Sequence, residues 1–91
     1  MIWVKKHDRV LAACDEDIIG KKFSDGRLEL HLNEDFYKGK LIDEVRFSKI
    51  LDGEENINIV GKKAVEVAVK KSLIADVKSI RGVPYAIIFR L

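Results

Sequence analysis

The segment of residues 58–71 places the strongest constraint on how this chain can fold. A β-branched run ends at Gly61, and the spacing between apolar residues then changes from about two to about 3.6. This change predicts a strand, a turn at Gly61 and a helix that continues to about Ser72. Such a junction points the first amides of the helix, together with Lys62 and Lys63, toward whatever lies above the end of the strand. The segment predicts an architecture and a place for a site, but it names no ligand.

The rest of the chain predicts an α+β fold in one domain of residues 1–91, because 91 residues leave no room for a second core. Strands alternate with two main helices, which favours a two-layer sandwich. We expect one mainly antiparallel or mixed sheet of four to six strands with both helices on one face, so that the other face stays partly open. Besides the segment above, the predicted elements are an opening β-hairpin (2–4 and 10–14), a strand (27–32), a helix (43–52), a strand (56–60) and a strand in two halves (77–80 and 84–91).

Apolar spacing within these elements also predicts which side chains are buried. The run 86–89 is apolar on both faces and is typical of a central strand. Short helical turns are expected after Cys14, ended by Gly20, and after a capping Asn33, closed near Gly39. The expected core residues outside the run 86–89 are Leu28, Leu30, Leu32, Val45, Phe47, Ile50, Leu51, Ala64, Val65, Ala68 and Val69.

Composition excludes several classes of protein. Basic and acidic residues number 17 and 15 and are interspersed, so the chain has no basic tail of the kind that strong nucleic-acid binders carry. A single cysteine excludes an internal disulfide framework and a multi-cysteine zinc site. The start of the sequence lacks the apolar core of a secretory signal, and no apolar run approaches the ~20 residues of a membrane span. We therefore expect a cytoplasmic protein without a membrane partner.

Acid–base, metal and thiol chemistry are each weakly supported. His7 and His31 match no familiar set of metal ligands, so we expect neither a metal nor another cofactor. The acidic clusters fall at predicted caps and turns, where acids are favoured for local backbone reasons. Cys14 precedes two acids, which would raise the pKa of its thiol, and a buried role for it is favoured over a catalytic one. We assign no catalytic residue.

Basic residues provide the stronger signal. Lysine doublets recur along the chain, and one pair of lysines flanks Gly39 next to two aromatic residues. Basic groups beside exposed aromatic rings suit phosphate contact and base stacking in RNA recognition. The spacing around Gly61 lacks the full glycine-rich pattern of a phosphate-binding loop. The residues proposed to form one phosphate-binding surface are Lys62, Lys63, Lys38, Lys40 and Tyr37.

Several short motifs, taken in their order and spacing, resemble the archaeal proteins grouped as the domain of unknown function 424. They are residues 11–16, 19–21, 36–39, 58–61 with Ala64 and Val65, and 82–84, so the resemblance extends over nearly the whole chain. It implies an archaeal source and a compact fold of helices and sheet, but no activity. It also implies a histidine after the Val-Pro pair, where this chain has Tyr85, so histidine chemistry is not expected there.

Three hypotheses about function follow. The first is a non-enzymatic binding module that contacts RNA or a protein–RNA assembly. The second is a small-ligand-binding protein or enzyme whose pocket includes Cys14, Asn58, Gly61 and Tyr85. The third is a structural homodimer that pairs through the open sheet face, using Trp3 or the carboxy-terminal strand.

Overall fold

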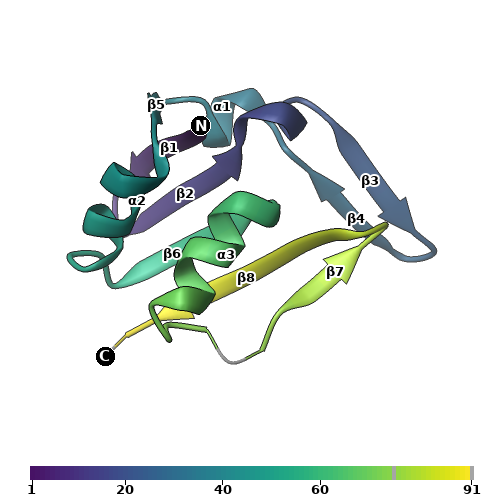
Figure 1. The fold of residues 1–91 in the computed structure, drawn as a ribbon. Coiled ribbons are helices and arrows are strands. Elements are labelled where there is room, and N and C mark those ends of the chain that lie inside the picture. The colour runs from purple at the N-terminus through teal and green to yellow at the C-terminus, as the bar shows by residue number, and fades with distance from the viewer. Residues whose placement is uncertain (75, 91) are drawn as a thin grey trace.

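The computed structural model describes residues 1–74 and 76–90, and its main feature is a mixed sheet of six strands (Figure 1). The strands lie in the order β5-β1-β2-β6-β8-β7, in which β2 and β6 are parallel and every other neighbouring pair is antiparallel. Their bounds are β1 (Ile2–His7), β2 (Val10–Asp15), β5 (Lys40–Ile42), β6 (Asn56–Val60), β7 (Lys78–Ile80) and β8 (Val83–Phe89). The predicted α+β fold with a sheet of up to six strands is confirmed.

The helices begin where the sequence predicts. The side chain of Asn33 accepts a hydrogen bond from the amide of Asp35, and that of Asp43 accepts one from the amide of Arg46. Among the described residues, no helix is long and apolar enough to cross a bilayer. The helical elements are η1 (Glu16–Ile18, a 3₁₀ turn), α1 (Glu34–Tyr37), α2 (Glu44–Leu51) and α3 (Lys62–Lys70), and a separate hairpin is formed by β3 (Lys22–Asp25) and β4 (Leu28–His31).

The main core lies between α2, α3 and one face of the sheet (Figure 1). Phe47 and Leu51 of α2 are four residues apart and fully buried, as one face of a helix requires. On α3 the stripe that faces the sheet is formed by Ala64, Val65 and Ala68. These side chains pack against alternate strand residues, namely Ile2, Val4, Leu11, Ala13, Ile57, Ile59 and Ile88.

A second apolar cluster covers part of the opposite sheet face. Cys14 and Val60 alternate with the residues of the main core along β2 and β6, so their side chains point the other way. The β3–β4 hairpin, α1 and the link between them pack over these side chains, with Leu32 in the link and Tyr37 in α1. The second face of the sheet is therefore open only beyond α1 and the hairpin.

Five residues expected in the core are exposed. Val45 of α2 (66% exposed) turns away from the face that Phe47 presents to the sheet, and Val69 (44% exposed) lies at the outer border of the stripe on α3. Leu28 (57% exposed) lies in the hairpin outside the main sheet. Ile87 and Phe89 (71% and 67% exposed) lie beyond the reach of β7, which pairs only with residues 83–85 of β8. The carboxy-terminal half of β8 is therefore an edge with one open face, rather than a central strand.

Candidate functional site

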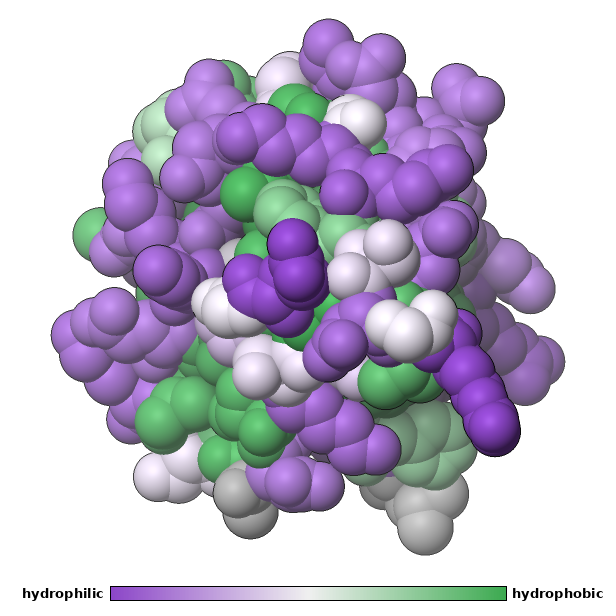
Figure 2. Space-filling model, turned by 90° about the vertical axis from the view of Figure 1, so that its right-hand side faces the viewer, coloured by the Kyte–Doolittle hydropathy of each residue, from purple (hydrophilic) through white to green (hydrophobic). Residues whose placement is uncertain are grey.

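A pocket of about 400 Å³ opens at the start of α3, on the side of the molecule that carries the β3–β4 hairpin. Figure 2 views the molecule from that side and shows apolar areas set among hydrophilic side chains. Four segments form its walls: the end of β2 with η1, the start of the hairpin that closely follows η1 in the sequence, the β6–α3 junction and the β7–β8 turn. The lining residues are Asp15, Asp17, Ile18, Lys21, Phe23, Gly61, Lys62, Lys63, Arg81, Gly82, Val83 and Pro84.

Asp15 fixes the position of α3 relative to the sheet. The parallel pairing of β2 with β6 sets Cys14 beside Val60, so Asp15 lies next to Gly61. Its two carboxylate oxygens accept hydrogen bonds from the backbone amides of Lys63 (2.9 Å) and Ala64 (2.8 Å). Gly61 occupies the capping position of α3 and has no side chain with which to cap it. Asp15 therefore performs the capping role from a neighbouring strand.

Gly61 is required by this arrangement for two physical reasons. Its φ of +111° lies in a region that residues with a side chain rarely adopt, and a Cβ there would lie 2.3 Å from Cγ of Asp15. Its amide donates to the carbonyl oxygen of Pro84 at 2.8 Å, which joins the start of α3 to β8 as well. The glycine that marks the strand–helix junction in the sequence is therefore the point where β2, β8 and α3 meet.

Burial and hydrogen bonding have opposite effects on the Asp15 carboxylate. The residue is only 4% exposed, and this burial raises the pKa of its carboxyl above the ordinary value. The amides of Lys63 and Ala64 each lower that pKa by less than burial raises it, the nearby charge of Asp17 raises it further, and the net shift is upward. A charge at this position is therefore costly, and the two amide bonds offset part of the cost.

The pocket as a whole is basic. Four basic side chains and two acidic ones line it, an excess of two positive charges. The basic residues, Lys21, Lys62, Lys63 and Arg81, are all exposed, and none of them forms an ion pair with another residue that the structure describes. Lysines elsewhere are often paired, as Lys70 is with Glu66 at 2.8 Å. The basic side chains at the pocket are thus available to an anion.

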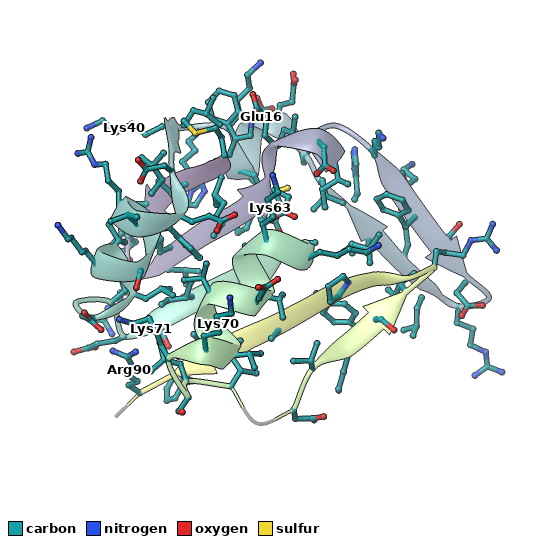
Figure 3. All side chains as sticks on the ribbon, viewed as in Figure 1. Glu16, Lys40, Lys63, Lys70, Lys71 and Arg90 are labelled. Carbon is teal, nitrogen blue, oxygen red and sulfur yellow. The ribbon has the colours of Figure 1, made fainter. Side chains whose placement is uncertain are left out.

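The five residues proposed as one phosphate-binding surface are not brought together. Lys62 and Lys63 line the pocket, whereas Lys40 lies on β5, well away from Lys63 in Figure 3. Lys38 pairs with Glu34 at 3.6 Å and sits over the ring of Trp3, at 5.4 Å from the ring centre. Tyr37 is only 7% exposed, so its ring is not presented for base stacking in this structure. Lys38, Lys40 and Tyr37 do not line the pocket, whereas Lys21 and Arg81 do.

Of the predicted pocket residues, only Gly61 lines this pocket. Cys14 and Tyr85 flank Val60 across β2, β6 and β8 and belong to the second apolar cluster. Asn58 is two residues before Val60, between Ala12 and Ile87. Because side chains alternate along a strand, the pocket receives the neighbours of the predicted residues: Asp15 in place of Cys14, and Pro84 in place of Tyr85.

The burial of Cys14 argues against thiol chemistry. The residue is fully buried, and its thiol donates to the carbonyl oxygen of Asp15 at 3.3 Å. Burial, followed by the nearby charges of Asp15 and Asp17, raises the pKa of the thiol to about 12. The reactive thiolate is therefore disfavoured near neutral pH.

Metal chemistry has no support from the described residues, among which no group of three or more His, Cys, Asp or Glu side chains is placed to hold a metal ion. His7 stacks on Phe36, with ring centres 4.5 Å apart, and one of its ring nitrogens lies 2.7 Å from the carbonyl oxygen of Phe36. His31 is exposed on β4.

Replacing Gly61 by alanine tests whether close approach to Asp15 shapes this site. We expect Gly61→Ala to lower the free energy of unfolding by about 3 kcal/mol or more, because a steric clash in a packed site adds to the cost of the positive φ. Gly20→Ala is the matched control, since Gly20 also has a positive φ (+82°) but open space where a Cβ would lie. For Gly20→Ala we expect the free energy of unfolding, measured by urea denaturation, to fall by about 1 kcal/mol. Equal decreases for the two variants would contradict the steric account.

The raised pKa of Asp15 predicts a pH-dependent stability. In the folded protein this carboxyl holds its proton more readily than in the unfolded chain, so its protonated form favours folding. That contribution is complete below the ordinary value of 3.8 and is lost as the pH rises through the raised value. Asp15→Asn cannot titrate. We therefore expect the free energy of unfolding of the wild type, minus that of Asp15→Asn, to fall as the pH rises from about 4 through the raised pKa of the Asp15 carboxyl.

Urea unfolding at several pH values measures this difference, with Asp25→Asn as a control for the removal of an exposed carboxylate. A difference that grows as the pH rises would show that the amide bonds of Lys63 and Ala64 outweigh burial, which would reverse the assigned direction of the pKa shift.

Comparison with known proteins places the chain among uncharacterised relatives. Residues 4–91 match the family described as "Protein of unknown function (DUF424)". This chain is similar in structure to an uncharacterised conserved protein from the archaeon Methanopyrus kandleri, whose crystal structure matches it with a TM-score of 0.75 and 27% sequence identity. The match covers 100% of this chain and 92% of that protein. No curated protein matches the chain significantly.

Proposed function

The chain belongs to the DUF424 family of proteins of unknown function, and we propose that it is a binding module that contacts RNA through the basic pocket at the start of α3. The observation that supports this proposal most strongly is the set of basic side chains, without ion pairs among the described residues, that three separate segments bring around one pocket: Lys21, Lys62, Lys63 and Arg81.

The composition of the pocket suits RNA better than an enzyme substrate. Lysine and arginine side chains contact phosphates, and the ring of Phe23, half-buried in the wall, offers a surface on which a base can stack. The Cys14 thiol is buried away from the pocket, and neither histidine lines it. Asp15 is held by two backbone amides, so it is a structural carboxylate in this proposal and not a general base.

The helix terminus itself is not the anion site in this proposal. The amides of Lys63 and Ala64, which could otherwise bind a phosphate, already donate to Asp15. Phosphate contact therefore depends on exposed side chains, whose attraction is screened by salt. We expect binding that weakens steeply as the salt concentration rises.

Paired lysine substitutions test the proposal. Lys21→Ala with Lys62→Ala removes two positive charges from the pocket, and Lys38→Ala with Lys40→Ala removes the two lysines of the predicted surface that lie outside the pocket. Fluorescence anisotropy with a single-stranded RNA should show affinity reduced about tenfold or more for the first pair, since one charge-assisted hydrogen bond contributes about 1.5 kcal/mol or more. The slope of log affinity against log salt should fall by about 1.4, at about 0.7 for each phosphate that a lysine no longer neutralises.

For the second pair we expect a change in affinity of less than about twofold, because Lys38 and Lys40 do not line the pocket and the attraction of exposed distant charges is screened by salt. Thermal melts of both variants establish that they remain folded. Equal reductions in affinity from the two pairs would place binding outside the pocket. Failure of the wild type to bind RNA even at low salt would remove the proposal altogether.

A homodimer is the second candidate, and a specific observation favours it. Ile87 and Phe89 lie two residues apart on β8, so they share one sheet face and form an exposed apolar pair there. Trp3, which the sequence offers as the alternative to the carboxy-terminal strand for this interface, is half-buried and has Lys38 over its ring. A monomeric mass in solution at micromolar concentration would contradict the dimer.

A further inference from the structure

The shape of the basic pocket narrows what part of an RNA it can take. Its volume of about 400 Å³ is near the lower end of the range for small-molecule sites, about 300 to 1,000 Å³. Its walls come from four segments, and the β7–β8 turn with Arg81 and Gly82 forms one of them. A pocket of this size and enclosure suits a single nucleotide. A continuous strand would instead require a groove that is open at both ends.

The charge of the pocket points to a terminal phosphate. An internal phosphodiester carries one negative charge, whereas a phosphate monoester carries about 1.5 to 2 near neutral pH. The excess of two positive charges on the pocket side chains matches the monoester. Since Asp15 occupies two of the amides at the start of α3, the phosphate charge would be met by Lys21, Lys62, Lys63 and Arg81.

The remaining lining suits the nucleoside. Phe23, Ile18, Val83 and Pro84 supply an aromatic ring and aliphatic surfaces, which accept the face of a base without regard to its sequence. Asp17 is exposed at the pocket, and its carboxylate is an acceptor for a ribose hydroxyl or an exocyclic amino group. The pocket thus combines cations for a phosphate, an apolar wall for a base and an acceptor for the sugar or base.

We infer that this pocket binds one nucleotide through its phosphate monoester, as the phosphorylated end of an RNA or as a free nucleoside monophosphate. The inference rests on the proposed RNA-binding function and names the part of the RNA that is recognised. The last nucleotide of an RNA chain can unstack and enter a pocket. An internal nucleotide of a stacked strand is not free to do so.

Three RNA hexamers of one sequence test the inference, with a 5′-phosphate, a 3′-phosphate or hydroxyl groups at both ends. We expect one phosphorylated hexamer to bind the wild type at least about tenfold more tightly than the unphosphorylated one at the same salt concentration, because the terminal phosphate adds about 1.5 to 2 negative charges. Lys21→Ala with Lys62→Ala should abolish this preference, and Lys38→Ala with Lys40→Ala should keep it. Competition by adenosine monophosphate, compared with adenosine, decides whether a free nucleotide suffices.

The failures of the two proposals are distinguishable. Equal binding of all three hexamers overturns the inference about the terminal nucleotide and leaves the RNA-binding function in place. A preference for phosphate that survives in Lys21→Ala with Lys62→Ala also overturns it, because recognition would then lie outside the pocket. Absence of binding to every hexamer at low salt overturns both.

Discussion

The hydrogen bonds from the amides of Lys63 and Ala64 to the Asp15 carboxylate are the interaction on which the rest of this structure depends. They join the end of β2 to the start of α3, and the amide of Gly61 joins the same point to β8 through Pro84. Only glycine fits there, because a side chain at Gly61 would overlap Asp15. The geometry places a carboxylate in a site that raises its pKa, so the energy of the junction is a balance between a desolvated charge and two amide bonds.

This junction also determines what the pocket beside it can do. A free helix terminus would attract anions through its amides, but here Asp15 already occupies two of them. In the proposed function the attraction for a phosphate comes instead from exposed side chains on three segments, because Lys21 and Arg81 line the same pocket as the lysines at the start of α3. A scaffold held by buried bonds therefore presents a set of charges that make no ion pairs among the described residues.

Local features of the fold could be predicted from the sequence. The opening hairpin, the caps at Asn33 and Asp43 and the strand–helix junction at Gly61 each depend on residues close together in the chain, and each is present. The exposed positions of Val45 and Val69 were not predicted, because the rotation of a helix about its axis depends on the surface against which it packs. Ile87 and Phe89 are exposed because they lie on a part of the second sheet face that no other described element covers, which the apolar run itself does not reveal.

The site was predicted in part for the same reason. Gly61, Lys62 and Lys63 are contiguous, and their role follows from the junction. Lys21 belongs to a lysine doublet and Arg81 to the interruption before β8, so both segments carry a signal in the sequence. Their meeting at one pocket depends on strand pairing and on where the hairpin packs, which are relations between distant segments. The predicted pocket residues Cys14 and Tyr85 are each one position away from the residues that line the pocket, Asp15 and Pro84. A difference of one position along a strand places a side chain on the opposite face of the sheet.

The most direct test of the account is to map RNA binding onto the backbone amides of the protein by NMR. A 5′- or 3′-phosphorylated RNA hexamer is added to uniformly ¹⁵N-labelled protein at low salt. If RNA binds in the pocket, the largest shifts fall on Lys21, Lys62, Lys63, Arg81 and Gly82, with little change at Lys38, Lys40 or Ile87. Shifts centred on the exposed face of β8 or on the β5 edge, with the pocket amides unmoved, would contradict it.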